Sequence, residues 1–357
     1  MTKWYNRPRF QKIAVPLLSV LLGILIGAII MFVFGYDPMK GYTAMIKGSL
    51  FTPFYIGQTL RLMAPLVVIA LGFAVANVAG FFNIGVAGQV LMGWLISVIV
   101  ANAFPSLPKI ILLPLSILAG MTAGAIWAGI AGYLRAYFNT SEVIVTIMLN
   151  HIAFYITNYF IREVLTNGSD STPRISPNAS LRIPFLSSIT NNSTLHGGIF
   201  ISVIMVVVVW FLLNKTTYGF EFRAVGLNSS AADYAGMNAK KNIILAMLVS
   251  GALAGLGGTM EGLGNFQNIF VQGVVPTIGF DGLGVALLGS SSPIGILFSA
   301  FLFSVLKTGG TSMPLISGAP NEIVDIVIAS IIFFVGANYI IRLLFAKMNK
   351  SAKKEVL

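Results

Sequence analysis

The chain has 357 residues, of which 56% are hydrophobic and only 9% charged, and its mean hydropathy is +0.88. A water-soluble domain carries about 25% charged residues, so the composition excludes such a domain and predicts a surface that faces lipid. The net charge is +11, but Lys and Arg lie mostly at the ends of apolar runs, which is typical of a topology signal and not of a nucleic-acid-binding face. No cysteine is present, which excludes disulfides and thiolate metal sites.

Ten apolar runs predict an all-α polytopic membrane protein. A span needs about 20 residues, and the expected spans cover 14–35, 60–79, 84–103, 110–133, 142–161, 198–213, 243–263, 278–290, 294–310 and 322–341. The first run is longer than the roughly 7–15 apolar residues of a secretory signal peptide, so we expect a retained helix. The eighth is too short to cross alone, and we expect it to be half of a broken helix whose other half lies within 264–277. A single transmembrane domain over 1–357 is expected.

The distribution of basic residues predicts the orientation. With the N-terminus placed inside, 14 of the 22 basic residues fall on inner segments: Lys3, Arg7, Arg9, Lys12, Arg135, Lys215, Arg223, Lys240, Lys241, Arg342, Lys347, Lys350, Lys353 and Lys354. The other eight fall outside or near outer helix ends: Lys40, Lys47, Arg61, Lys109, Arg162, Arg174, Arg182 and Lys307. Because inner loops carry the excess of Lys and Arg, both termini are expected on the cytoplasmic side.

Two long connections differ in character. The segment 162–197 is polar and is placed outside, whereas 214–242 is placed inside and carries a potential helix start at Asn228 or Ser229. Small residues follow this start, and we expect Ala232 on the surface, where it would fit a groove in a partner. No Walker motif is present in the sequence, so energy from ATP would have to arrive through a separate subunit docked on 214–242. The alternative is an ordinary solvated loop.

Glycine spacing and a weak internal echo predict how the helices pack. Glycines four apart let membrane helices approach closely; such pairs are Gly23/Gly27, Gly120/Gly124 and Gly251/Gly255. The sequence of segment 82–87 is weakly similar to that of segment 280–286. Spans 2–5 and 7–10 would then form two units of opposite orientation. In transporters built from inverted repeats, the pathway lies at the interface between the repeats.

Acidic residues within apolar runs are candidates for the substrate pathway or for helix caps. A buried charge in a membrane usually faces a cavity or marks a helix end. Glu142 follows a Thr-Ser pair at a helix start, so capping is the favoured interpretation; the same holds for Glu322 and Asp325. Glu261 and Asp281 flank the expected break and are the better pathway candidates. His151 and His196 are interpreted as a helix-packing residue and a loop residue, and no catalytic or metal-ligating constellation is seen, so the chain is not expected to be an enzyme.

A Gly-interrupted stretch at the mouth of span 3 carries an amide at each end. These amides belong to Asn83 and Gln89. Irregular backbone at membrane depth is tolerated where it is buried in protein or lines a cavity. An amide-lined cavity would suit an uncharged, hydrogen-bonding solute such as a sugar or nucleoside. Asn77 and Asn150 complete the set of polar residues assigned to the pathway.

Three segments resemble one family. FFNIGVAGQVLMG (81–93) resembles the FNIG-x-EGQ signature in the ribose and branched-chain amino acid type of ABC-importer permeases. RAVGLNSSAADYAGMNAKKNIILAMLVSGALAGLGG (223–258) resembles the family's coupling segment and the helix that follows it, and SEVIVTIMLN (141–150) is similar to a run of the nucleoside-importing branch. The chain departs from the pattern at Ala87, where the branch usually has Glu.

The resemblance implies a permease of the vitamin B12-importer-like architecture, with ten helices and inverted repeats, in the cell membrane. It implies an ATPase partner that holds ATP and Mg, with no cofactor in this chain, a second permease subunit (a heterodimer, or a pair of identical subunits) and an extracytoplasmic solute-binding lipoprotein. The coupling residues would be Arg223, Gly226, Asn228, Ala231, Ala232, Tyr234 and Gly236. The expected solute is a nucleoside; the alternatives are a simple sugar such as ribose, or an ion-coupled secondary transporter.

Overall fold

The computed structural model describes the backbone of residues 8–337 and the side chains from Ala14 onward, and this part of the chain is helical without a β-sheet. The long helices are α1 (Pro8–Val33), α3 (Pro53–Val78), α4 (Val86–Ala103), α5 (Lys109–Phe138), α6 (Glu142–Tyr159), α8 (Gly198–Lys215), α11 (Ala239–Met260), α13 (Pro293–Gly310) and α15 (Glu322–Gly336). Shorter helices are α2 (Pro38–Leu50), α7 (Pro184–Ile189), α9 (Thr217–Leu227), α10 (Ser229–Tyr234), α12 (Ile278–Leu288) and α14 (Met313–Ser317), with helical turns η2 (Phe160–Leu165), η3 (Pro177–Ala179) and η4 (Glu261–Phe266).

Eight helices in the described residues are long and apolar enough to cross a membrane: Ala14–Val33, Pro53–Val78, Val86–Ala103, Lys109–Phe138, Glu142–Leu165, Gly198–Lys215, Ala239–Phe266 and Pro293–Gly310. They coincide with eight of the ten expected runs. The expected run 278–290 is the short helix α12, and 322–341 is α15, whose expected last residues (338–341) lie outside the described residues. The multi-pass character predicted from composition is thereby supported.

The expected broken helix differs from the structure. Helix α11 continues through the π-helical turn η4 to Phe266, and the chain then runs without a helix until α12 begins at Ile278. The prediction of a second half-helix within 264–277 is therefore wrong. Gln267, which ends η4, has a left-handed backbone with φ of 62°, and this conformation stops the helix because it cannot continue a right-handed one.

Helix α2 was not expected. Asp37 caps it, since its carboxylate accepts hydrogen bonds from the backbone N–H groups of Met39 (2.9 Å) and Lys40 (3.2 Å), and Pro38 begins the first turn. Gly41, Ala44 and Met45 are buried on one face of α2, which packs against α13 and α14. Apolar runs do not predict this helix, because its sequence mixes polar and apolar residues.

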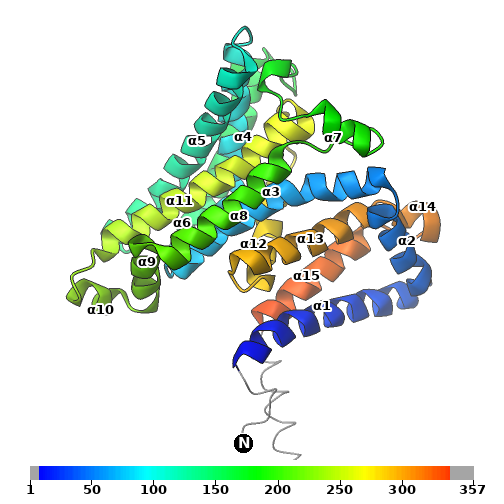
Figure 1. Cartoon of the computed structure of the whole chain (residues 1–357), viewed down its shortest axis with the longest axis horizontal. Coiled ribbons are helices and arrows are strands. Elements are labelled where there is room, and N and C mark those ends of the chain that lie inside the picture. The colour runs from blue at the N-terminus through cyan, green and yellow to red at the C-terminus, as the bar shows by residue number, and fades with distance from the viewer. Residues whose placement is uncertain (1–7, 338–357) are drawn as a thin grey trace, which may run out of the picture.

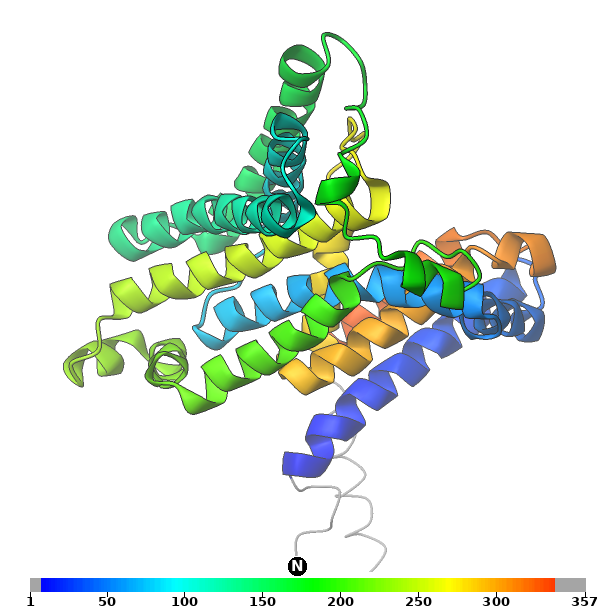
Figure 2. The same cartoon turned by 45° about the horizontal axis from the view of Figure 1, so that its top comes forward.

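Close glycine contacts join the central helices. An added Cβ on Gly124 of α5 would collide with the backbone oxygen of Gly251 of α11, and a Cβ on Gly255 would collide with the oxygen of Gly120. The predicted close packing at these two glycine pairs is confirmed. In Figure 2, α11 (yellow-green) lies between α5 (teal) and α3 (light blue), and it contacts both. Helices α3, α4 and α11 form the buried centre of the bundle, while α1, α5, α6 and α8 lie at its periphery.

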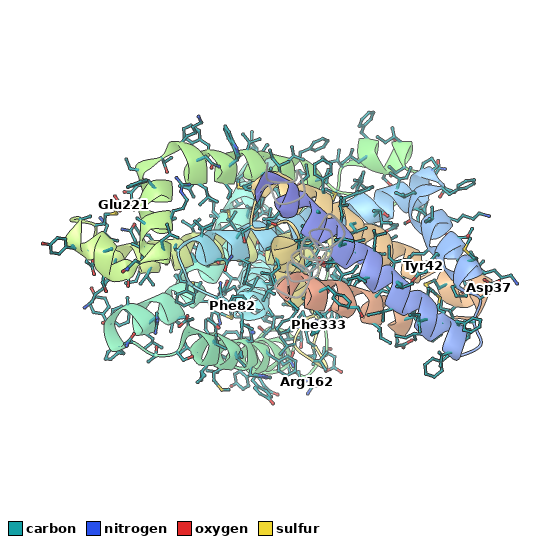
Figure 3. The ribbon with its side chains drawn as sticks, turned by 90° about the horizontal axis from the view of Figure 1, so that it is seen from below. Asp37, Tyr42, Phe82, Arg162, Glu221 and Phe333 are labelled. Atoms are coloured by element: carbon teal, nitrogen blue, oxygen red, sulfur yellow. The ribbon has the colours of Figure 1, made fainter. Side chains whose placement is uncertain are left out.

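Both described ends of the chain lie on the same side as the 214–242 segment. Helix α1 is antiparallel to α15, since Gly23 contacts Ile331 and Gly27 contacts Val327. Helix α15 ends near the ends of α12 and α3, because Ile332 packs on Gly284 and Asn77 hydrogen-bonds Ser291 (3.0 Å). The end of α3 in turn contacts α9. Figures 1 and 3 show the opposite placement of the other connections: α14 lies far from α9 and α10, and Asp37 lies at the far end from Glu221.

Candidate functional site

The amide groups of Asn83 and Gln89 bind each other. Asn83 Nδ2 donates to Gln89 Oε1 (3.1 Å), and Gln89 Nε2 donates to Asn83 Oδ1 (3.0 Å). Asn83 Nδ2 also donates to the hydroxyl of Ser250 on α11 (2.9 Å), and Asn83 Oδ1 accepts from the Gly85 N–H (3.0 Å). Both side chains are buried. In this conformation they fasten the start of α4 to α11, and a role in the pathway remains a prediction.

Asn150 of α6 belongs to the same cluster. Its Oδ1 accepts from the Gly88 N–H (2.7 Å), and its Nδ2 donates to the Ile84 carbonyl (2.9 Å). The stretch from Ile84 to Gln89 is thus held from two helices, and side-chain amides satisfy the Ile84 carbonyl and the N–H groups of Gly85 and Gly88. The structure brings together three of the predicted pathway residues here.

The structure also accounts for Ala87, where the family resemblance led us to expect Glu. Ala87 is fully buried, and an added Cβ on Gly279 would stand 2.5 Å from the Ala87 Cα. The residue that precedes the 280–286 segment, Gly279, therefore touches Ala87, the last residue of the 82–87 segment. A carboxylate at position 87 would be buried in this tight contact, and burying an unpaired charge costs several kcal/mol. Alanine avoids that cost.

Three other predicted pathway residues make local contacts. Asn77 hydrogen-bonds Ser291 beyond α12. Glu142 lies in the first turn of α6 and pairs with Arg135 of α5 (Nε–Oε2, 3.3 Å), while Ser141 caps the helix, which fits the capping interpretation. Asp281 is buried near the start of α12 and forms an ion pair with Lys307 of α13. These residues lie in three separate places rather than in one site.

Glu261 is part of a buried polar network. Its Oε1 accepts a hydrogen bond from Asn265 Nδ2 (2.8 Å), one turn further along η4. Asn265 Oδ1 in turn meets His196 Nε2 at 3.0 Å. Arg182 of the 162–197 connection donates to the backbone oxygens of Gly264 (3.0 Å) and Asn265 (2.7 Å). This connection is thereby fastened to η4, which continues α11.

His196 lies in the loop before α8, as the sequence indicated, and its side chain is buried in this network. Its Nδ1 accepts a hydrogen bond from the Gly198 N–H (3.1 Å), so the ring proton lies on Nε2, which donates to Asn265. Burial lowers the pKa of His196 to about 4, while the Asn265 hydrogen bond opposes this shift. The imidazole is therefore neutral at physiological pH. The glycine at 264, where a Cβ would stand 2.7 Å from the His196 ring, was a signal for this close contact.

A cavity of about 470 Å³ opens beside Glu261. It is lined by Trp94, Glu261, Phe266, Phe270, Gln272, Gly273, Val274, Pro276, Thr277 and Ile278. Of the predicted pathway residues only Glu261 lies on this wall. Sequence analysis missed the aromatic residues because they come from α4, from η4 and from the irregular segment after it, and no spacing rule joins them.

The 214–242 segment forms two helices with an exposed tip. Asn228 caps α10, since its Oδ1 accepts from the Ala231 N–H (3.0 Å), and Gly236 ends the tip with φ of 85°. The predicted helix start is therefore confirmed. The expectation of an exposed Ala232 is wrong: α10 folds back on α9, and Ala232 is buried against Val225 and Ala239.

Two of the exposed side chains of this tip are large, those of Leu227 and Tyr234. Tyr234 is 98% exposed and Leu227 88% exposed, and Ala231 is also exposed. Arg223 donates to the Leu213 carbonyl and fastens α9 to α8. Singly exposed apolar side chains are common, so a docking role for this tip remains a prediction.

Gly226 connects this tip to the membrane helices. An added Cβ on Gly226 would stand 2.8 Å from the backbone nitrogen of Gly80, and one on Gly80 would stand 2.9 Å from the Gly226 Cα. The two backbones touch because neither residue has a side chain. Gly80 itself has φ of 78°, a left-handed conformation that favours glycine. The turn between α3 and α4, which leads into Asn83, therefore rests directly on α9.

Comparison with known proteins identifies the family. The family described as "branched-chain amino acid transport system / permease component" matches residues 55–336. The chain belongs to this family. Its members are transport components and not enzymes, as the sequence predicted. No solved structure matches the chain.

Curated relatives cover nearly the whole chain. The guanosine ABC transporter permease protein of Bacillus subtilis is 47% identical over 342 residues, which is 96% of this chain and 98% of the relative. The nucleoside ABC transporter permease protein of Lactococcus lactis is 47% identical over 343 residues, 94% of each. The glucose ABC transporter permease protein of Haloferax volcanii is 34% identical over 335 residues, 92% of this chain and 88% of the relative. Bacillus subtilis has a second guanosine permease protein that is 29% identical over 74% of this chain. Lactococcus lactis has a second nucleoside permease protein that is 26% identical over 75% of this chain.

Proposed function

We propose that this chain is the membrane-spanning permease subunit of an ATP-driven importer of nucleosides. The observation that carries the proposal is the 47% identity, along 94% or more of the chain, to permeases described for guanosine and for nucleosides. The 34% identity to a glucose permease makes a sugar importer the second candidate. An ion-coupled secondary transporter is disfavoured, since the family is one of ABC permeases.

The partners follow from the same proposal. The sequence contains no Walker motif, so a separate ATPase subunit would bind ATP and Mg and dock on the exposed tip around Leu227 and Tyr234. A second permease subunit would complete the pathway, which is supported by the two permease proteins of each substrate description in Bacillus subtilis and Lactococcus lactis. An extracytoplasmic solute-binding lipoprotein would deliver the nucleoside from the other side.

We further propose a single permease domain over 1–357, with ten spans in the cell membrane and a vitamin B12-importer-like arrangement. The eight long spans would be completed by α12 and α15. Both termini would be cytoplasmic, which is supported by the basic residues of the inner segments and by the position of Pro8 and Gly336 on the side of α9 and α10.

Cysteine labelling tests this orientation, because the chain has no cysteine of its own. Ser171→Cys should react with a membrane-impermeant maleimide on intact cells, since Ser171 is exposed on the outer connection. Asn238→Cys, at an exposed position within the 214–242 segment, should react only after the membrane is opened. The reversed pattern would overturn the orientation and leave the family assignment untouched.

Uptake of labelled solutes tests the substrate. In a strain that lacks the gene for this chain, uptake of guanosine or another nucleoside should be lost and should return with a plasmid copy, while uptake of glucose and ribose should not change. Loss of sugar uptake with normal nucleoside uptake would favour the second candidate.

A further inference from the structure

The cavity beside Glu261 has an aromatic wall. The rings of Trp94 and Phe266 are stacked, with centroids 5.2 Å apart and planes 16° apart, and Phe270 meets both rings edge-on at 5.5 and 5.2 Å. All three residues line the cavity. Stacked aromatic rings offer flat faces on which a planar, polarisable ligand gains energy that a non-planar ligand does not gain.

The aromatic wall is held in place before any ligand arrives. Trp94 Nε1 donates to the Asn268 carbonyl (2.8 Å), and the absent side chain of Gly262 leaves room for the indole, since a Cβ there would stand 2.6 Å from Trp94 Cδ1. The backbone beside Phe270 is fastened to the outer connection at Thr172, whose N–H donates to the Ile269 carbonyl (2.9 Å). A site fixed in advance loses little conformational entropy on binding.

Polar groups lie on the same wall. Glu261 has its Oε1 engaged by Asn265, and among the described residues no donor meets Oε2. Gln272 donates through Nε2 to the Phe270 carbonyl (3.0 Å), which leaves its amide oxygen as an acceptor. The cavity, about 470 Å³, lies within the usual range of small-molecule sites, roughly 300–1,000 Å³.

We propose that this cavity binds the nucleobase of a nucleoside in transit, with the base against the rings of Phe266 and Phe270 and its N–H edge directed at Glu261. This inference rests on the proposed function and adds to it a binding site within this chain. The acceptor oxygens of Glu261 and Gln272 favour bases that present a ring N–H and an amino group together as donors, as guanine does. Bases with a single amino donor fit these acceptors less well. A free sugar offers hydroxyl groups but no planar face for the aromatic wall.

A protection experiment tests occupancy directly. Val274 lines the cavity and is 71% exposed, so Val274→Cys should react with a thiol reagent in membranes that contain the assembled transporter. Guanosine at about ten times its dissociation constant should slow the labelling of this chain about tenfold, and ribose should not. The matched control is Ser188→Cys, exposed on α7 outside the cavity, whose labelling should not respond to guanosine.

The outcome is separable from the proposed function. If the wild-type transporter takes up nucleosides but guanosine leaves the labelling of Val274→Cys unchanged, the binding site is wrong and the proposed function stands. If ribose protects as well as guanosine, the site does not read the base. If the wild type takes up no nucleoside at all, the proposed function is wrong, and the nucleobase site that rests on it is wrong as well.

Ring substitutions test the aromatic wall. Phe266→Ala should weaken the apparent affinity for guanosine by roughly 5- to 140-fold, the loss measured for one base–aromatic stack, whereas Phe266→Trp should preserve it. Phe301→Ala is the matched control, because Phe301 is exposed to a similar extent (38% against 44%) but lies on α13 outside the cavity. Equal affinity in Phe266→Ala and Phe301→Ala would overturn the proposal.

Discussion

Replacing Tyr234 with alanine is expected to detach the ATPase while leaving the permease folded. The side chain is 98% exposed at the tip of α10, so its removal breaks few contacts within this chain. A docked tyrosine buries about 150–250 Å², and at about 25 cal/mol per Å² this corresponds to about 4–6 kcal/mol of gross stabilisation. Because the costs of association consume part of that gain, we expect the net loss of a hot-spot aromatic, about 2–4 kcal/mol.

That loss corresponds to a roughly 30- to 700-fold weaker dissociation constant for the ATPase. The assay is titration of purified ATPase onto permease in detergent or nanodiscs, with the melting temperature of the permease measured alongside. Leu227→Ala should act in the same direction. Leu315→Ala is the matched control, since Leu315 is 90% exposed but lies on α14 at the opposite end of the molecule. Unchanged ATPase affinity in Tyr234→Ala would refute the assignment of the docking tip.

Two further predictions concern transmission and pH. Gly226→Ala should let the ATPase bind but reduce ATP-driven uptake by roughly 5- to 150-fold, because the new methyl group forces apart the contact with Gly80 and overpacking costs about 1–3 kcal/mol. The control is Gly336→Ala, whose added Cβ would meet no atom of the described residues within 4 Å and which should behave as wild type. The pKa of His196 is lowered from 6.5 to about 4, so its contribution to stability is complete above pH 6.5 and is lost as the pH falls to about 4. That loss is about 3 kcal/mol and should appear as a melting temperature that falls as the pH is lowered. In His196→Asn this pH dependence should be weaker. The control His151→Asn, on the exposed face of α6, should keep the pH dependence of the wild type.

Apolar run length predicted most of the fold because lipid leaves the chain few choices. A backbone in hydrocarbon must satisfy its own hydrogen bonds, so long apolar runs become helices, and eight of the ten expected spans have that form. The same reasoning failed at 264–277. There the backbone is irregular and only partly buried, and Asn158 and the 162–197 connection supply several of its hydrogen bonds. Run length carries no information about such contacts.

The candidate site was predicted only in part for a similar reason. Asn83, Gln89 and Asn150 were recognised as a polar group within an apolar chain, and they do meet. Their amides bind each other and the backbone, which a linear sequence cannot reveal. Trp94 and Phe270 lie far apart in the chain and meet only because α4 and α11 pack side by side through Gly93 and Gly255.

The burial of Ala232 illustrates the same limit on a smaller scale. A short helix with several alanines does not indicate which alanine faces the partner. That choice depends on how α10 folds back on α9, where Val225 and Ala239 cover Ala232. The exposed Leu227 and Tyr234 were therefore the better candidates for docking, although only Tyr234 was among the coupling residues that the resemblance implied.

The most direct test of the account is transport by the reconstituted assembly. Proteoliposomes that contain this chain, its second permease and its ATPase, supplied with the solute-binding protein, should accumulate labelled guanosine only when ATP is present on the ATPase side. Unlabelled nucleosides should compete for this uptake, and glucose and ribose should not. Accumulation of a sugar in place of nucleosides, or nucleoside uptake that does not depend on ATP, would contradict the account.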